Sequence, residues 1–389
     1  MPTKILVVDD EPDLSLMISQ KFRRQVREKE LAFVFASNGV EALAKLQEDG
    51  EIDVVMTDIN MPEMDGLALL AKITENYPLL KTVIVSAYGD MKNIRTALNH
   101  GAFDFVTKPI DFDDLDLTIK KTIYEASLLK KAAQERDQLV ALQRELDVAK
   151  AIQKNIVPKT FPPFPGRAEF ELHAEMIPAR EVGGDFYDFF LIGDQQVGFV
   201  IGDVSGKGVP AALFMAVSKT VLKATALKGL PPHECLQQVN RILFMESVDE
   251  MFVTVFYGIL NTATGEVSFC NGGHNRPYIV RPPGHTEMLT GQDGLMLGLL
   301  EHWDYQVNKI SLAPGEGLIL YTDGVTEAMN RDHEQFGEER VAASLQQLTG
   351  APLTEMIAGV VKDVNAFVDG APQADDLTIL TLRYAGTSV

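Results

Sequence analysis

The chain has 389 residues, enough for two or three domains, because a single hydrophobic core seldom grows beyond about 250–300 residues. Hydrophobic residues make up 46% of the chain and charged residues 23%, which is ordinary for a globular protein and excludes a mostly disordered one. The net charge of −20 weighs against nucleic acids and anionic membranes as partners, since binding to both depends largely on Lys and Arg.

We expect neither export nor a membrane span. The longest apolar runs, such as 5–8 and 253–259, are far shorter than the roughly 20 residues that cross a bilayer. An acidic pair, Asp9 and Asp10, follows the N-terminus too closely for a signal peptide. The two cysteines form neither a CxxC motif nor a disulfide framework. These features together predict a cytoplasmic protein.

The first 124 residues alternate short apolar runs with amphipathic stretches. Strands are expected at 5–8, 33–36, 54–57, 82–86 and 103–107, and helices near 13–27, 38–48, 65–76 and 90–100. Nearly continuous apolar runs are typical of strands that are buried on both faces. This region therefore predicts an α/β domain in which helices cover both faces of a five-stranded parallel sheet, a doubly wound fold.

Residues 114–157 contain neither Gly nor Pro, which predicts one long helix. Nine positions from 128 to 156 follow a 4-3 spacing, and seven of them are apolar, Glu135 and Gln153 being the exceptions. This pattern is typical of a coiled-coil seam, although a helix packed on its own domain also fits. We expect a coiled-coil linker at 125–157 and a homodimer.

A proline-rich segment at 157–166 ends this helix, because proline removes a backbone donor and fixes φ. Beyond it, strands are expected at 170–176, 196–203, 252–260, 266–271, 277–281, 317–321 and 377–383, and helices at 210–227, 232–245, 337–347 and 353–368. Strands and helices that occur in blocks predict an α+β domain with a large antiparallel sheet at 158–389.

Three carboxylates and one lysine follow strands of the N-terminal domain. Asp9 and Asp10 come directly after the first strand, Asp58 ends the third, and Lys108 follows the fifth. Ligands gather at the carboxyl ends of the strands in such sheets, so these side chains should converge and require a hard cation such as Mg²⁺. An aspartate beside a metal and a lysine can attack phosphorus. Taken singly, Asp10 and Asp58 could instead be helix N-caps or surface residues.

Four motifs of residues 1–124 resemble the CheY-like receiver domain of two-component response regulators; they are 5–12, 56–66, 86–87 and 107–109. The resemblance implies that a partner histidine kinase phosphorylates Asp58. It implies that Ser86 binds the phosphoryl group, that Lys108 is its counter-ion and that Phe105 is an aromatic switch. The bond between Lys108 and Pro109 is a candidate cis peptide. The implied ligands of Mg²⁺ are Asp9, Asp10, Asp58 and the Asn60 carbonyl.

Four acidic motifs carry the candidate chemistry of the C-terminal domain; they are EVGGDFYD at 181–188, IGDVSGKG at 201–208, YTDG at 321–324 and QADDLT at 373–378. Each places an Asp at or just after an apolar run. Ligands that are all oxygen favour Mg²⁺ or Mn²⁺ over zinc, and carboxylates from several segments suit a two-metal centre that activates water. Singly, the Asp-Gly and Asp-Asp pairs could be turns. The Gly-Lys-Gly sequence lacks the spacing of a nucleotide-binding loop.

These motifs, with NGGHN at 271–275 and the segment 146–158, resemble the bacterial SpoIIE/RsbU branch of the PPM-type metal-dependent protein phosphatases over about 146–384. The resemblance implies an αββα sandwich, two Mn²⁺ or Mg²⁺ ions and hydrolysis of phosphoserine or phosphothreonine. The implied ligands are Asp185, Asp203, the Val204 carbonyl, Asp323 and Asp375. We favour Asp375 over Asp376, because the family's ligand lies three residues before the Thr. His274 could bind metal or donate a proton, but we expect a structural loop histidine.

The primary interpretation is a response regulator whose phosphorylation at Asp58 controls a metal-dependent serine/threonine phosphatase. By analogy with the family, the phosphoprotein substrate would be an anti-sigma-factor antagonist. The alternative is an adaptor that uses an inactive phosphatase fold to bind a partner protein. The presence of every candidate metal carboxylate argues against the adaptor. A DNA-binding output has no helix-turn-helix candidate and the wrong net charge.

Overall fold

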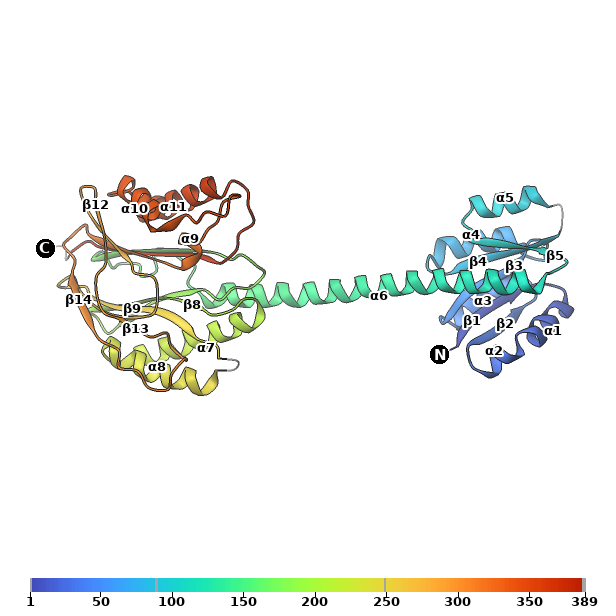
Figure 1. The fold of residues 1–389 in the computed structure, drawn as a ribbon, viewed down its shortest axis with the longest axis horizontal. Helices are drawn as coiled ribbons and strands as arrows, with labels where there is room; N and C mark the ends of the chain where they lie inside the picture. Colours follow the sequence, from blue (N-terminus) through green and yellow to red (C-terminus); the bar gives the residue numbers. More distant parts are fainter. Residues whose placement is uncertain (1, 88–89, 248–249, 387–389) are drawn as a thin grey trace. The chain divides into compact units, whose positions relative to one another are not determined.

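The computed structural model describes residues 2–87, 90–247 and 250–386. The chain divides into two compact units, Met1–Leu142 and Gln143–Val389. A single helix of 45 residues, α6 (Phe112–Ile156), contributes to both units (Figure 1). The long helix predicted over 114–157 is thereby confirmed, and it includes the last helix of the N-terminal unit.

The N-terminal unit contains a parallel sheet with the strand order β2-β1-β3-β4-β5. Its strands are β1 (Thr3–Val8), β2 (Leu31–Ala36), β3 (Ile52–Asp58), β4 (Lys81–Ala87) and β5 (Asp104–Lys108). Its other helices are α1 (Pro12–Lys21), α2 (Arg23–Arg27), α3 (Gly39–Glu48), α4 (Gly66–Asn76) and α5 (Met91–Asn99). The predicted doubly wound α/β fold is confirmed. The helix expected at 13–27 is divided at Phe22, whose backbone leaves the helical conformation.

Both faces of this sheet are buried, which explains the continuous apolar runs. Ile5 and Val7 of β1 pack in one core cluster with residues of α1 and α6. Leu6 and Val8, which point to the opposite face, pack in a second cluster with residues of α3 and α4. The central positions of such a strand are therefore apolar, and partly exposed polar residues occur near its start, as with Lys4 of β1 and Asp53 of β3.

Two sheets form the C-terminal unit. The first sheet has the strand order β13-β10-β9-β8-β7, and β14 also pairs with β10. Its strands are β7 (Phe186–Ile192), β8 (Gln196–Val204), β9 (Val253–Asn261), β10 (Glu266–Gly272), β13 (Asp293–Gly294) and β14 (Asn308–Ser311). The second has the order β12-β11-β15-β16-β6, with β6 (Phe170–Ile177), β11 (Tyr278–Arg281), β12 (His285–Met288), β15 (Gly317–Tyr321) and β16 (Leu377–Tyr384). The pairing is antiparallel apart from the short parallel contact of β10 with β13.

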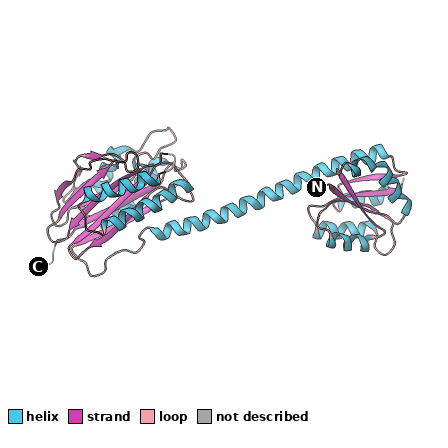
Figure 2. Ribbon diagram, turned by 90° about the horizontal axis from the view of Figure 1, so that it is seen from below, coloured by secondary structure: helices cyan, strands magenta, loops and turns pink. Residues whose placement is uncertain are grey.

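A helical layer covers the outer face of each of these sheets (Figure 1, Figure 2). On the first sheet lie α7 (Val209–Ala226) and α8 (Pro232–Glu246), and on the second lie α10 (Gly337–Gln347) and α11 (Leu353–Val368), while α9 (Asp323–Thr326) is a single turn. The main core cluster combines residues of both sheets, such as Phe199 and Leu380. The expected αββα sandwich is confirmed. The single large sheet expected from the strand pattern is instead a pair of sheets, and β7, β12, β13 and β14 are not among the expected strands.

Helix α7 is long and apolar enough, by length and composition alone, to cross a membrane. Its residues Ala211, Met215 and Leu222 are buried in the core cluster, and the helix packs on β7 and β8. Its apolar composition is therefore explained by packing within the unit.

Candidate functional site

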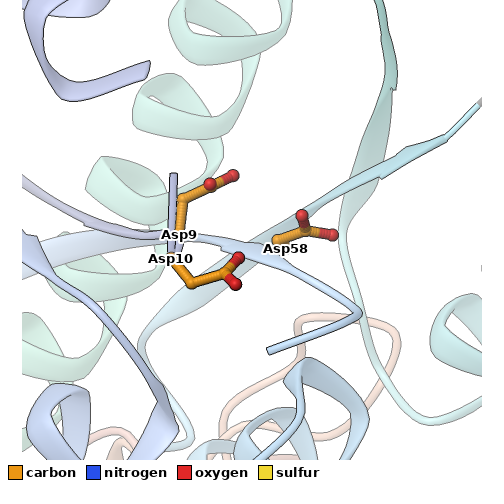
Figure 3. Close-up of side chains that lie close together, drawn as sticks. All are labelled: Asp9, Asp10 and Asp58. Atoms are coloured by element: carbon orange, nitrogen blue, oxygen red, sulfur yellow. The ribbon is translucent and has the colours of Figure 1, made fainter. Parts of the chain in front are cut away.

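Asp9, Asp10 and Asp58 come together at the carboxyl ends of β1 and β3. The parallel register pairs Val8 with Thr57, so that Asp9 and Asp58 follow on neighbouring strands. One ligand oxygen from each of the three carboxylates lies within 4.8 Å of the others, and Figure 3 shows the three side chains close together. The predicted convergence is thus present in the structure. Three carboxylates and no sulfur or nitrogen ligand form a donor set that fits Mg²⁺.

Lys108, at the end of β5, reaches these carboxylates. Its Nζ lies 2.6 Å from Asp58 Oδ2, 2.9 Å from Asp9 Oδ2 and 3.2 Å from Glu11 Oε1. Burial lowers the pKa of Lys108, but hydrogen bonds with Asp58 and Asp9 outweigh it and leave this pKa raised. Burial also raises the pKa of Asp9. Lys108 therefore stays charged and offsets part of the negative charge. Its bond to Pro109 is cis, as expected.

The other residues predicted for the N-terminal site lie on β4, on β5 and just beyond β3. Ser86 is fully buried on β4, the strand between β3 and β5, and its Oγ donates to Asp90 Oδ2 at 3.4 Å. Asn60 is exposed just beyond β3, and its backbone N–H donates to Asp58 Oδ1 at 3.3 Å. Phe105 is half-buried on β5.

The carboxylates of the C-terminal unit come from strand ends in both sheets. Asp185 precedes β7, and Asp203 lies near the end of β8. Asp323 follows β15 as the first residue of α9, and Asp375 precedes β16. Because β7 and β8 are antiparallel, as are β15 and β16, the start of one strand in each pair lies beside the end of the other. Each sheet therefore offers two carboxylates at one edge.

Asp185 links the two sheets. It is 1% exposed, and its Oδ2 accepts hydrogen bonds from Thr322 Oγ1 at 2.7 Å and Thr378 Oγ1 at 2.6 Å, both at strand ends of the second sheet. Burial raises the pKa of Asp185 well above its usual value, and the carboxylates of Asp203 and Asp376 raise it further. Neither threonine was predicted as a site residue, although both occur in the acidic motifs.

Asp203 and Asp323 carry unfavourable negative charge. Burial raises the pKa of Asp203 to about 7, with further contributions from Asp323 and Asp375. Burial, then Asp375 and Glu327, raise the pKa of Asp323 to about 6. Burial is the main cause of both shifts and the neighbouring carboxylates add to it, so a divalent cation bound among them would relieve the repulsion. Within the described residues, they are less tightly grouped than the three aspartates of the N-terminal site.

The adjacent residues Asp375 and Asp376 have different environments. Asp376 is buried, and its two carboxylate oxygens accept the backbone N–H groups of Ala179 and Gly184, each at 2.8 Å. Asp375 is half-buried and lies 2.8 Å from Lys207 Nζ through Oδ2. Both oxygens of Asp376 thus bind the backbone, although its charge also acts on Asp185, whereas Asp375 is paired with Lys207. The choice of Asp375 as the metal ligand stays a prediction.

The glycines of the acidic motifs allow close packing around Asp376. A Cβ atom on Gly183 would lie 1.8 Å from Asp376 Oδ2, and one on Gly324 would lie 1.9 Å from the Asp376 carbonyl oxygen. A Cβ on Gly184 would lie 2.8 Å from the Val204 carbonyl oxygen. Side chains at these three positions would force the backbone away from the site, which gives a steric reason for glycine.

His274 is buried behind Asp203. Its Nδ1 lies 2.9 Å from Thr254 Oγ1, which in turn lies 3.3 Å from the carbonyl oxygen of Asp203. Asn271 bonds both the backbone N–H and the carbonyl of His274, each at 2.8 Å. Burial lowers the pKa of His274 to about 4, so the ring is neutral. These contacts hold the ring in place, and the structural role of this residue stays a prediction.

Gln153 of α6 contacts the loop before Asp185, and the sequence did not predict this contact. It is 5% exposed; its Nε2 donates to the Gly183 carbonyl at 2.6 Å, and its Oε1 accepts the Gly183 N–H at 3.1 Å. One turn earlier, Lys150 forms an ion pair of 2.8 Å with Glu181. The sequence did contain a sign of this contact, because Gln153 is a polar residue at a position of the otherwise apolar 4-3 pattern. The end of α6 therefore holds the loop that leads to Asp185.

Two family models match the chain. Residues 5–120 match the response regulator receiver domain, and residues 193–385 match the stage II sporulation protein E (SpoIIE) family. Protein IcfG of Synechocystis sp. is 29% identical over 297 residues, which cover 69% of this chain and 46% of that protein. Phosphoserine phosphatase RsbU of Bacillus subtilis is 26% identical over 263 residues, which cover 65% of this chain and 75% of RsbU. The chain thus spans about half the length of IcfG.

Among solved structures, the SiaA-PP2C domain of Pseudomonas aeruginosa matches with a TM-score of 0.55 and 24% identity, covering 65% of this chain and 99% of that domain. This likeness supports the fold of the C-terminal unit. Both resemblances stated from the motifs are confirmed. The chain therefore joins an N-terminal response regulator receiver domain to a C-terminal SpoIIE-type phosphatase domain of the PPM superfamily.

Proposed function

We propose that this chain is a response regulator whose receiver domain controls a metal-dependent protein serine/threonine phosphatase. One observation carries the proposal: four carboxylates at strand ends of two sheets act on one another, since Asp203 raises the pKa of Asp185, and Asp323 and Asp375 add to the burial that raises the pKa of Asp203 to about 7. Charge repulsion of this kind favours cation binding. The similarity to RsbU, a phosphoserine phosphatase, supports hydrolysis of a phosphoprotein.

In this proposal the C-terminal carboxylates hold two Mn²⁺ or Mg²⁺ ions; the ligands are Asp185, Asp203, Asp323, Asp375 and the Val204 carbonyl. When bound, the ions would supply an activated water and offset charge on the phosphoryl oxygens. Thr322 and Thr378 orient Asp185 by their hydrogen bonds to Oδ2. Asp376 fixes the backbone of the loop before Asp185.

Asp58 is the proposed phospho-acceptor of the receiver, and its carboxylate oxygen would attack the phosphorus of a phosphohistidine on the partner kinase. The P–N bond breaks as the P–O bond forms. Lys108, 2.6 Å from Asp58, would stabilise charge on the transferred group, and Ser86 would bind a phosphoryl oxygen, with a shift of Phe105. The proposed Mg²⁺ ligands are Asp9, Asp10, Asp58 and the Asn60 carbonyl.

We infer that α6 connects the two activities. Lys130 on this helix pairs with Asp53 of the N-terminal unit, and Gln153 near its end holds Gly183, two residues before Asp185. A continuous helix can transmit a rotation or shift, whereas a flexible linker could not. Exposed apolar residues on α6, such as Leu139, suit a parallel homodimer. The proposed bounds are 1–124 for the receiver, 125–157 for the linker and 158–389 for the phosphatase.

The proposed substrate is a phosphorylated anti-sigma-factor antagonist, in the cytoplasm. The test measures phosphate release from a phosphoserine protein with Mn²⁺ by the wild type and by Asp203→Asn. We expect release by the wild type and a loss of several orders of magnitude in the variant. Binding without release by the metal-loaded wild type would support the adaptor alternative.

A further inference from the structure

A cavity of 320 Å³ lies beside the carboxylates of the C-terminal unit. Its walls come from the segment that follows Asp323, from the last turn of α11 and from the loop that leads to Asp375. Asp375 and Gly324 line the cavity and also belong to the carboxylate site. Any molecule bound across these carboxylates would therefore have the cavity as its immediate neighbour.

The inner surface of this cavity is mainly apolar. Val364 and Leu377 are buried within the wall, whereas Met329 is 39% exposed and Val368 is half-buried. Glu327 also lines the cavity and is exposed. Lys207 lines the cavity as well, but its charge is paired with Asp375 at 2.8 Å, so Glu327 and the nearby Asp323 leave the surroundings acidic and would repel an acidic side chain. The chemistry of the cavity thus suits an uncharged, apolar group.

Hydrogen bonds hold the wall in place. Gln373 Nε2 donates to the carbonyl oxygens of Ile177, at 2.9 Å, and Asp375, at 2.7 Å. Lys207 Nζ donates to the Ala374 carbonyl at 2.7 Å. The loop between α11 and β16 is therefore tied to the rest of the unit on both sides of the cavity. A preformed site loses less conformational entropy when it binds a ligand.

We propose that this cavity is a substrate subsite that receives an apolar side chain, such as Leu, Met or Phe, close in sequence to the phosphoserine. The inference rests on the proposed phosphatase function. An extended polypeptide advances about 3.3 Å per residue, so a residue within about three positions of a phosphoserine over the carboxylates would reach Asp375 and the cavity behind it. Burial of one such side chain corresponds to about a 10- to 100-fold gain in kcat/KM.

Phosphoserine peptides in a Gly/Ser background test this proposal, with Leu placed in turn at each of the three positions on either side. In the wild type with Mn²⁺, we expect Leu at one position to raise kcat/KM about 10- to 100-fold over Ser. Met329→Trp, which places a bulkier side chain in the wall of the cavity, should reduce that ratio to less than about threefold. The ratio compares two peptides on the same enzyme, so a general loss of activity cancels.

Val307→Trp is the matched control, because Val307 is 42% exposed and does not line the cavity. It should keep the wild-type ratio. Release of phosphate without any preference for Leu, or a ratio unchanged in Met329→Trp, would overturn the subsite and leave the phosphatase function standing.

Fluorescence anisotropy of the same labelled peptides, with the full chain in EDTA, separates the two proposals further. Binding of the Leu peptide that is tighter than that of the Ser peptide in the wild type, but not in Met329→Trp, supports the subsite. If no peptide is hydrolysed at the same time, the phosphatase function is contradicted while the subsite stands. Equal binding of the Leu and Ser peptides, together with equal turnover, would refute the subsite.

Discussion

Replacement of Asp203 by Asn should stabilise the metal-free protein while it abolishes the response to metal. The pKa of Asp203 is raised from 3.8 to about 7, chiefly by burial. A group whose pKa is higher in the folded state binds its proton more tightly there, so the folded state loses stability as the pH rises from 3.8 to about 7 and remains less stable above it. Asn has a similar shape but carries no charge.

The size of this effect follows from the rise in pKa. At about 1.4 kcal/mol per pKa unit, the raised pKa of Asp203 lowers the free energy of unfolding by at most about 4 kcal/mol at pH 8, and by about 2 kcal/mol at pH 5, where only the unfolded state ionises. For a unit of this size, 1 kcal/mol corresponds to roughly 2–4 °C in Tm. In EDTA at pH 8, Asp203→Asn should therefore raise Tm by about 5–15 °C, and by less at pH 5.

Tryptophan fluorescence is the appropriate assay, because Trp303 is the only tryptophan of the chain and lies in the C-terminal unit. Mn²⁺ should raise the Tm of the wild type and have little effect on the variant. Asp194→Asn is the control: this aspartate is exposed between β7 and β8, and its replacement should change neither value. A Tm of Asp203→Asn below that of the wild type in EDTA would refute the predicted cost of the Asp203 charge. A rise in its Tm with Mn²⁺ as large as that of the wild type would refute Asp203 as a metal ligand.

Three further predictions concern the receiver and the linker. A small phosphodonor with Mg²⁺ should phosphorylate the wild type at Asp58 and should not phosphorylate Asp58→Ala. Mass spectrometry locates the phosphoryl group, and its presence on another residue would contradict Asp58 as the acceptor. Insertion of four residues after Gln138 should uncouple phosphatase activity from phosphorylation of Asp58, because it breaks the phase of the apolar 4-3 pattern. Insertion of seven residues restores this phase and should preserve much of the coupling. Equal coupling in the two insertion variants would contradict pairing of α6 in a homodimer. Gln153→Ala should destabilise the C-terminal unit by about 2 kcal/mol, because it leaves the backbone N–H and carbonyl of Gly183 unpaired. The exposed Gln143→Ala is the control, and equal unfolding midpoints of the two variants would show that Gln153 does not hold the loop before Asp185.

Features that depend on local pattern could be predicted from the sequence. The strands of the receiver are continuous apolar runs because helices cover both faces of their sheet, and Asp9, Asp58 and Lys108 converge because they follow strands at the same edge. The position of α6 follows from a long stretch without Gly or Pro. These inferences need only the chain direction and the periodicity.

Features that depend on distant contacts could not be predicted in the same way. Asp376 accepts N–H groups from residues more than 190 positions away, so its backbone-holding role could not be predicted from the local motif, although the spacing to the Thr already favoured Asp375 as the ligand. Gln153 occupies a position where the helix pattern calls for an apolar residue, and its partner lies 30 residues further on. Strand β7 was missed because it begins inside a glycine-rich acidic motif.

The way α6 is shared also bears on how proteins of this architecture can be recombined. Ala126, a third of the way along the helix, packs in the receiver core, while Gln153, followed by Val157 just after the helix, is buried in the C-terminal unit. Between them, from Lys131 to Val148, the side chains are mostly exposed and belong to neither core. A chimera joined inside this segment would keep both cores intact, whereas one joined at Pro158 would remove Gln153 from the phosphatase. The exposed middle of the helix is thus the place where a different sensory module could replace the receiver without repacking its neighbour.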